Sequence, residues 1–527
     1  MSAIITDQFR ILNASNFVAS VANTANSYYT FMSLSDPTTA GFGRTSTWND
    51  SGGPPFPTDN INYSNHAYDT MLFGKRVTSA NTRRLVRKVN WVQGSTYDYY
   101  RHDYSSTNQS QVTNSNRLYG ANYYVVNSEF RVYICLDNGT AAGISTVPSS
   151  SLDEPTFTDV EPTRAGTSGD GYLWKYLYTI SPSDIVKFDS TEYITVPNDW
   201  STTTDVGIQA VRDNGNSEIN NNQIKVVAID DPGLGYPQFT AREFDILGDG
   251  TGAKVRITTN SLGQIIETQV TAGGAGYSFG RVDLSSENSG IQTATAAFAT
   301  LVPIIPPSKG HGFDVYKELG ADKVLMYSRF DNSSFDFASD TVFAQVGIVQ
   351  NPASFGSDSI FTDNQFSALY AIKYESQSAA QDLVVGDKIE QTVGVGSTAR
   401  GIVASYDTNT KIIKYYQDRS LYFNPASGGQ KDNFGVNFRS PVIDFTSSAN
   451  AITKTGGSFS VNVDQNFTGI TTTLASGKVV NLGVQFTDGL ANPEINKRKG
   501  EIIYLDNRPS VTRNERQKED VKIVLEF

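Results

Sequence analysis

Gly500-Glu-Ile-Ile-Tyr-Leu-Asp-Asn-Arg-Pro-Ser-Val-Thr512, followed after a charged segment by Val521-Lys-Ile-Val-Leu-Glu-Phe527, is the stretch that decides the fold. It contains two apolar strand patterns separated by a polar, turn-rich segment. In the second pattern, alternate residues are apolar and predict one strand face directed into a core: Val521, Ile523, Leu525 and Phe527. Because a strand pair alone is marginally stable in water, these strands must complete a sheet with strands from much earlier in the chain.

The composition favours β structure in a soluble protein. The 527 residues include 27 Tyr, 29 Phe and 44 Gly, and Asn, Ser and Thr crowd between short apolar runs. This length allows two to four domains with a large buried core. A net charge of -12 argues against general binding to nucleic acid or a membrane surface, because the overall field repels phosphates.

The single cysteine and the start of the chain indicate the compartment. Cys135 alone excludes an internal disulfide and a multi-cysteine zinc site, and fits synthesis in a reducing compartment. Residues 1–10 lack a basic segment followed by an apolar stretch, and no run approaches the roughly 18 apolar residues of a membrane span. We therefore expect a soluble, unexported protein.

Short helices are predicted among many strands. Apolar residues at helical spacing after the possible cap Thr6 predict an N-terminal helix: Phe9, Leu12, Phe17, Val18 and Val21. His66–Val77 is predicted as a short helix, and Ser181-Pro-Ser-Asp184 as a helix start. Residues 51–59 are too rich in proline for regular structure. Strands are predicted at Tyr28–Leu34, Arg83–Trp91, Asn122–Leu136 and Tyr172–Ile180.

Two internal blocks resemble small β modules. Ile229-Asp-Asp-Pro-Gly-Leu-Gly-Tyr236 recurs as Val270-Thr-Ala-Gly-Gly-Ala-Gly-Tyr277, which predicts a duplicated β unit with left-handed glycines and a tyrosine packed over each turn. The second block covers about residues 380–425, where Asp407-Thr-Asn-Thr410 between alternating segments predicts a hairpin.

No catalytic constellation emerges from the motifs. Gly276-Tyr-Ser-Phe-Gly280 fits a nucleophile elbow, but a strand pattern follows it, so Ser278 is interpreted as a turn residue. Gly248-Asp-Gly-Thr-Gly252 resembles a phosphate-binding loop, yet it also leads into a strand rather than a helix. The three histidines are isolated in sequence, so no metal site is predicted: His66, His102 and His311.

An aromatic run leaves two interpretations open. Tyr97-Asp-Tyr-Tyr-Arg-His-Asp-Tyr104 has the residue types of a sugar- or protein-binding surface. Packing into a core or loop is the favoured alternative, because large aromatic side chains are usually buried.

Five stretches together resemble a known family. In chain order they are Pro54-Pro-Phe-Pro-Thr-Asp59, Gly169-Asp-Gly-Tyr-Leu-Trp-Lys-Tyr-Leu177, Glu192-Tyr-Ile-Thr-Val-Pro197, Phe343-Ala-Gln-Val-Gly-Ile-Val-Gln-Asn-Pro352 and Gly500-Glu-Ile-Ile-Tyr-Leu-Asp-Asn-Arg-Pro509. The ordered set resembles the dimeric baseplate wedge subunit of T-even-type, contractile-tailed bacteriophages. The resemblance covers roughly residues 1–215, 305–375 and 485–527.

This resemblance implies a structural subunit of the virion. It implies a mainly β fold, a layered β-sandwich with a few short helices, that forms a homodimer without enzymatic activity or cofactors. Its implied location is the tail baseplate, assembled in the host cytoplasm with other wedge proteins and, as further candidates, tail-fibre proteins. Its implied role is to hold neighbouring wedge proteins together and to take part in the rearrangement of the baseplate on infection. Alternatives are a carbohydrate-binding tail adhesin or fibre-attachment protein and, third, a tail-spike glycoside hydrolase.

The domain plan follows from the resemblance and the inserted blocks. The β-sandwich core is expected at 1–215, 305–379 and 486–527. A β module with the internal repeat is inserted at 216–304. A second β module and an Asn/Ser/Thr-rich segment occupy 380–485.

One basic run is a candidate partner interface. Residues 75–88 are locally positive in a chain whose net charge is negative, and they contain no acidic residue. The cations of this run are Lys75, Arg76, Arg83, Arg84, Arg87 and Lys88. A solvated face is the alternative of about equal weight. The presence of arginines favours the interpretation as a partner interface, because the planar guanidinium pairs bidentately with carboxylates. We expect reversal of Arg83, Arg84 and Arg87 to slow assembly while leaving thermal stability nearly unchanged.

Overall fold

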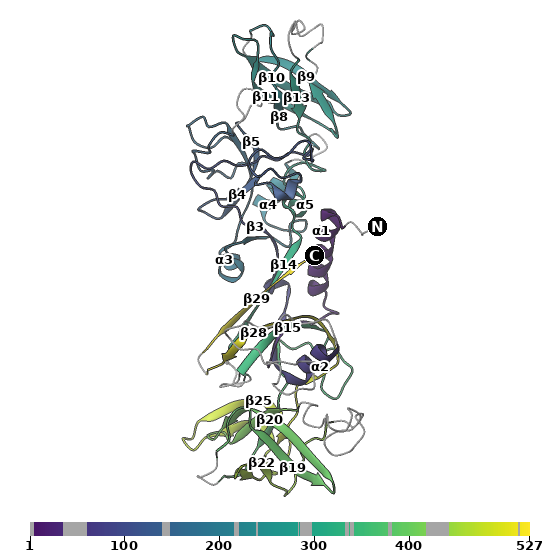
Figure 1. Cartoon of the computed structure of the whole chain (residues 1–527), viewed down its shortest axis with the longest axis vertical. Coiled ribbons are helices and arrows are strands. Elements are labelled where there is room, and N and C mark those ends of the chain that lie inside the picture. The colour runs from purple at the N-terminus through teal and green to yellow at the C-terminus, as the bar shows by residue number, and fades with distance from the viewer. Residues whose placement is uncertain are drawn as a thin grey trace. The chain divides into compact units, whose positions relative to one another are not determined.

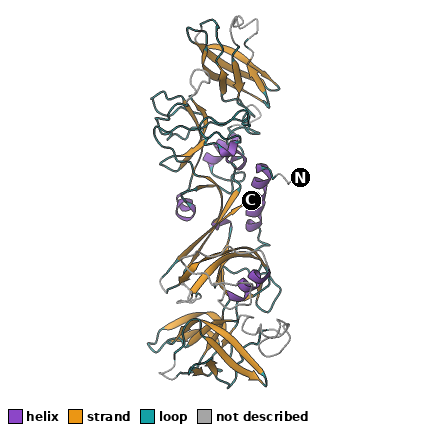
Figure 2. Cartoon of the chain, in the orientation of Figure 1, coloured by secondary structure: helices purple, strands orange, loops and turns teal. Residues whose placement is uncertain are grey.

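The protein, described from a computed structural model, is mainly β with a few short helices, as predicted (Figures 1 and 2). The structure describes residues 5–34, 61–139, 148–214, 221–238, 241–282, 284, 298–331, 337, 342–377, 382–417, 442–514 and 517–527. The predicted loop at 51–59 lies outside them. The α-helices in the described ranges are α1 (Asp7–Ala22), α2 (Ile61–Thr70), α3 (Pro182–Phe188), α4 (Val206–Asp213) and α5 (Val315–Leu319).

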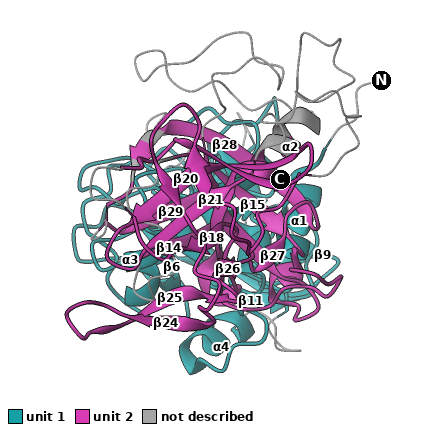
Figure 3. Cartoon of the chain, turned by 90° about the horizontal axis from the view of Figure 1, so that it is seen from below, with its two compact units in different colours: residues 1–18, 83–325, 524–527 teal, residues 19–82, 326–523 magenta. Residues whose placement is uncertain are grey.

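The chain divides into two compact units, each built from separate segments (Figure 3). Unit 1 contains residues 1–18, 83–325 and 524–527, and unit 2 contains residues 19–82 and 326–523. A four-stranded sheet has the order β29 (Glu519–Glu526), β14 (Lys323–Phe330), β3 (Thr82–Arg87) and β7 (Tyr193–Val196).

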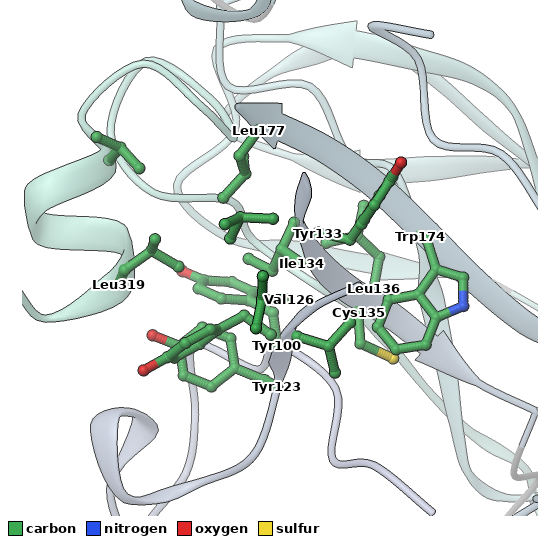
Figure 4. Close-up of a cluster of buried hydrophobic side chains, with 14 of the residues drawn as sticks. Tyr100, Tyr123, Val126, Tyr133, Ile134, Cys135, Leu136, Trp174, Leu177 and Leu319 are labelled. Atoms are coloured by element: carbon green, nitrogen blue, oxygen red, sulfur yellow. The ribbon is translucent and has the colours of Figure 1, made fainter. Parts of the chain in front are cut away.

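Unit 1 has its largest core around a three-stranded antiparallel sheet. Aromatic side chains are numerous in this core, among them Tyr100, Tyr123, Tyr133 and Trp174 (Figure 4). Tyr172 stacks on Trp174 with ring centroids 5.4 Å apart. The single cysteine, Cys135, is fully buried there. The sheet has the order β4 (Tyr124–Val126), β5 (Arg131–Asn138) and β6 (Tyr172–Thr179).

The stretch with the internal repeat has a core of its own within unit 1. The repeated glycines adopt the left-handed conformation in matching pairs, with φ of 63° and 62° at Gly233 and Gly274 and of 85° and 80° at Gly235 and Gly276. Tyr236 and Tyr277 are both buried, so the predicted left-handed glycines and buried tyrosines are confirmed. The strands are β11 (Ile265–Ala275), β10 (Thr251–Thr259), β9 (Arg242–Gly248) and β12 (Gly280–Val282) in one sheet, and β13 (Thr300–Pro303) and β8 (Val227–Asp231) in another.

The β8–β13 ribbon is shared between two cores. Ala228 on β8 packs in the core of the three-stranded sheet, while its neighbours Val227 and Ile229 pack in the core of the repeat. Alternate residues of a strand point to opposite faces, which explains this division. The ribbon is therefore structural for both cores.

Unit 2 is layered. Met32 and Phe73 from its five-stranded sheet share a core with Ala404 and Tyr416 from its seven-stranded sheet, while Phe31 packs on the opposite face. The first sheet is β17 (Gln365–Ser367), β2 (Met71–Val77), β1 (Tyr28–Ser33), β15 (Val342–Gln350) and β28 (Glu501–Thr512). The second is β23 (Ser460–Val461), β22 (Ile452–Lys454), β19 (Lys388–Gly394), β20 (Ser397–Asp407), β21 (Ile412–Tyr416), β18 (Tyr370–Lys373) and β26 (Leu490–Ala491).

Two smaller sheets complete unit 2 in the described part of the chain. They are β16 (Ala353–Ser354) with β27 (Ile495–Asn496), and β24 (Gly469–Thr473) with β25 (Val479–Phe486). The predicted hairpin at Asp407–Thr410 is confirmed, because it connects the antiparallel strands β20 and β21.

The two C-terminal strands join different sheets. β28 pairs with β15, so that Ile502 lies opposite Val349, and β29 lies beside β14. The prediction that each strand pairs with one from earlier in the chain is confirmed, but the prediction that the two complete the same sheet was wrong. In β29, Ile523 is buried while Lys522 and Val524 are exposed, as the alternation predicts.

Two predicted elements were wrong in part. Residues 71–77 form β2 rather than the second half of a helix, because they pair with β1 and β17 and Gly74 lies against the Phe366 ring. The predicted strand Asn122–Leu136 is a hairpin of β4 and β5 with Phe130 at a φ of 58°. The predicted helix start at Ser181 is confirmed, since its side chain caps α3 by accepting from Asp184 N.

Candidate functional site

The first two residues of the predicted basic interface lie on β2 in unit 2 and have internal partners. Lys75 Nζ donates to Gln365 Oε1 at 2.7 Å and lies 5.9 Å from the centroid of the Phe337 ring. The Arg76 guanidinium donates to the carbonyl oxygen of Thr362. Both side chains are half-buried, so their charges are partly engaged within the unit.

Arg83 and Lys88 belong to unit 1 and pair with carboxylates at the two ends of α3. Arg83 Nε lies 3.0 Å from Asp184 Oδ2, and Lys88 Nζ lies 2.9 Å from Asp189 Oδ1. Arg83 also lies 5.2 Å from the centroid of the Phe188 ring. These ion pairs neutralise two of the six charges inside the chain.

Arg84 is buried, whereas Arg87 is exposed. Arg84 is 6% exposed, and its guanidinium carbon lies 4.0 Å from the centroid of the Tyr316 ring. Burial lowers the pKa of Arg84, against the opposing effects of Tyr316 and Asp314. Arg87 Nη2 donates to the carbonyl oxygen of Ala121 at 2.9 Å. The predicted partner interface stays a prediction, and within β3 Arg87 is the arginine placed to serve it.

Arg87 and Lys88 line a polar cleft of about 590 Å³ within unit 1. The cleft is bounded by the first turns of α1, the end of β3 and the start of β14. Distant parts of the chain supply its charged side chains: the cations Arg10, Arg87, Lys88, Arg117 and Lys323, and the carboxylates Asp7, Glu192, Asp322 and Glu526.

Most of the cleft's carboxylates are already paired. Lys323 Nζ lies 2.9 Å from Asp322 Oδ1 and 3.1 Å from Glu526 Oε1. Burial, the largest single effect, works to lower the pKa of Lys323, but the interactions with Asp322 and Glu526 together outweigh it and the net shift is upward. Arg117 Nη1 is 3.8 Å from Asp7 Oδ1.

Two arginines of the cleft remain without a carboxylate partner among the described residues. They are Arg10 on α1 and Arg87 on β3. Because a guanidinium binds carboxylates in a bidentate geometry, this pair offers a place for acidic side chains from another protein. Arg10, Arg117 and Lys323 were not predicted as site residues, because each is a single charge in a different part of the chain.

Ser278 lies in a turn and not at a nucleophile elbow. Its Oγ is 2.5 Å from Asp249 Oδ2, and β12 follows directly from Gly280. Hydrogen bonds from Ser278, and from the backbone of Phe279, lower the pKa of Asp249 to about 2. The turn interpretation is therefore confirmed, and Gly248–Gly252 likewise leads from β9 into β10.

The aromatic run packs into the core. Tyr97, Tyr99 and Tyr100 are buried in the cluster around the three-stranded sheet, so the core interpretation is confirmed. The neighbouring Arg101 binds Asp230 of β8, with Nη1 2.7 Å from Oδ1, and thereby anchors the shared ribbon.

The histidines have separate surroundings where their side chains are described. His102 Nδ1 accepts from Ile305 N at 3.2 Å, and His311 Nδ1 lies 2.6 Å from Glu318 Oε1. The His66 side chain lies outside the description. Within the described ranges, no group of three or more His, Cys, Asp or Glu has the arrangement of a metal site. No helix there is both long and apolar enough to cross a membrane.

Comparison with known proteins gives one informative similarity. The chain is 27% identical over 218 residues to the baseplate wedge protein gp8 of Enterobacteria phage T4. This supports a protein of the phage baseplate type. The match covers 37% of this chain and 60% of the T4 protein, so the chain spans less than two thirds of that relative. No protein-family model matches the chain.

Proposed function

We propose that this chain is a structural subunit of the baseplate wedge in a contractile phage tail. The observation that carries the proposal is the similarity to the T4 baseplate wedge protein gp8. The proposed role is to hold neighbouring wedge proteins together and to take part in baseplate assembly and rearrangement on infection, without enzymatic activity.

The positions of the family-like stretches support this proposal. Phe343–Pro352 contributes most of β15 and Gly500–Pro509 most of β28, and these two strands pair in the five-stranded sheet. Gly169–Leu177 contributes most of β6 in the core of unit 1. Stretches that are distant in sequence thus contribute strands that pack in the cores of the two units, where a shared fold constrains sequence most strongly.

The unpaired arginines of the cleft suggest how a neighbour is held. Arg10 and Arg87 would each bind a carboxylate of an adjacent wedge protein, while the internally paired charges keep the cleft rigid. Arginine–carboxylate pairs at the rim of an interface mainly accelerate encounter and fix orientation. Tail-fibre proteins are further candidate neighbours.

Removing the chain from assembling particles tests this function. If the gene is deleted from the phage genome, we expect tails without complete baseplates in negative-stain electron microscopy, and rescue by the wild-type chain supplied in trans. Infectious particles with normal baseplates would contradict the proposal.

The homodimer is a separate part of the proposal. Closed two-fold pairing is the commonest assembly of soluble subunits, and the family resemblance implies it as well. We expect light scattering at micromolar concentration to give twice the chain mass of 57.4 kDa. A strictly monomeric mass would count against the dimer, while the gene deletion tests the baseplate role independently.

A further inference from the structure

The β24–β25 hairpin presents an exposed strand edge. Its two strands form a sheet of their own, and the hairpin extends outward from the rest of unit 2 (Figure 3). Ile470 is 41% exposed, and Thr471 and Thr473 are also exposed. Within the described residues, no other strand pairs with the outer edge of β24.

The hydrogen-bond pattern identifies the backbone groups on that edge. Leu474 N donates to Lys478 O at 2.9 Å, so residue 474 points toward β25. Antiparallel pairs alternate between bonded and non-bonded residues along a strand. With Thr472 opposite Val480 and Thr473 opposite Val479, the outward N–H and C=O groups belong to Thr471 and Thr473.

This edge lacks the usual protection against strand addition. Proteins commonly protect edge strands with charged side chains or proline. β24 reads Gly469-Ile-Thr-Thr-Thr473, which has neither and consists mainly of β-branched residues. Because the outward groups need donors and acceptors at strand spacing, an extended polypeptide is the partner that satisfies them.

A pocket at the base of the hairpin indicates the chemistry of that partner. The pocket of about 530 Å³ is lined by Ile470 of β24, one residue before the outward-facing Thr471, by Gly483–Gln485 of β25 and by the segment that follows. Its lining contains two carboxylates, Asp488 and Glu494, and neither Lys nor Arg. Such a pocket favours a cationic side chain.

We propose that β24 is a docking edge for an extended segment of a different protein, and that this segment carries a Lys or Arg at the position that enters the pocket. Strand addition of this kind gains affinity from the main chain and specificity from pockets for alternate side chains. Pairing of β24 with the β24 of a second copy fits poorly, since this strand carries no cation to enter the pocket.

The test uses the full chain and labelled eight-residue peptides of alternating Val and Thr with one central Lys, Glu or Gln. We expect fluorescence anisotropy to show at least tenfold tighter binding of the Lys peptide than of the Glu peptide. Hydrogen–deuterium exchange should then slow at residues 469–473. Absence of binding, or binding without protection of these residues, would overturn the proposal.

Matched variants separate the edge from the hairpin. Thr473→Pro removes an outward N–H but no bond to β25, and should weaken binding of the Lys peptide at least tenfold. Thr473→Val keeps the N–H and should bind like the wild type. Asp488→Asn should reduce the preference for Lys over Gln. Unchanged binding of the Lys peptide by Thr473→Pro would refute edge docking. A doubled mass together with slow hydrogen–deuterium exchange at residues 469–473 in the absence of peptide would identify a second copy as the occupant, and would also overturn the proposal.

Discussion

Replacing Arg84 and Arg87 one at a time by alanine should separate a structural arginine from an interface arginine. Arg84 lies in the interior, with its guanidinium over the Tyr316 ring and Nη1 donating to the carbonyl oxygen of Asn198 at 3.3 Å. Arg87 is exposed and has one hydrogen bond to the carbonyl oxygen of Ala121. The two residues lie on the same strand, which makes each the control for the other.

The structure predicts a clear difference in stability. Arg84→Ala loses a cation–π contact worth about 1–2 kcal/mol and a hydrogen bond worth about 1 kcal/mol. Relief of the cost of burying the charge offsets part of this loss. We expect a net loss of about 2 kcal/mol, or roughly 4–8 °C in melting temperature for a unit of this size. Arg87→Ala should cost about 0.5 kcal/mol, in the range of surface substitutions.

The assay has two parts. Calorimetry gives the melting temperatures of both variants, and wedge assembly rates are measured at two ionic strengths. Arg87→Glu should slow assembly at low salt and weaken its salt dependence without unfolding the protein. Reversing Arg83, Arg84 and Arg87 together should lower the melting temperature, and not leave it nearly unchanged as the sequence predicted. That variant removes a buried cation, Arg84, and the ion-pair partner of Asp184, Arg83. Equal melting temperatures for the two alanine variants would refute this reasoning.

Three further outcomes are expected. Gly274→Ala should destabilise the protein more than Gly276→Ala in denaturant unfolding. Both glycines have positive φ, but a Cβ at 274 would lie 2.5 Å from a backbone oxygen, whereas one at 276 would make only an ordinary contact of 3.9 Å with Gly250 Cα. Ser278→Ala should raise the pKa of Asp249, measured by NMR titration, because it removes a hydrogen bond to the carboxylate, and should leave the biological role intact. Replacing 219–303 by a Gly/Ser linker should leave a cooperative but less stable remainder in thermal melts, because the β8–β13 ribbon leaves the larger core; an insoluble or molten product would show that the block belongs to the main core.

Local patterns in the sequence predicted many elements correctly. The cap at Ser181, the alternation in β29 and the left-handed glycine pairs of the repeat each follow from residue types over a few positions. Such signals are physical constraints on the backbone itself, so distant packing changes them little.

Features that depend on distant residues were not predictable in the same way. The burial of Arg84 depends on Tyr316. Residues 71–77, which were predicted as helix, form a strand because they pair with β1 and β17. The cleft brings together Arg10, Arg87 and Lys323 from separate regions. A run of charges in sequence gives no information about which charges meet a partner after folding.

The most direct test of the proposed function is electron cryo-microscopy of the intact phage particle. We expect density matching this chain in the tail baseplate, with the cleft at Arg10 and Arg87 facing carboxylates of a neighbouring wedge protein. Density for the chain in a tail fibre, or its absence from the particle, would contradict the account.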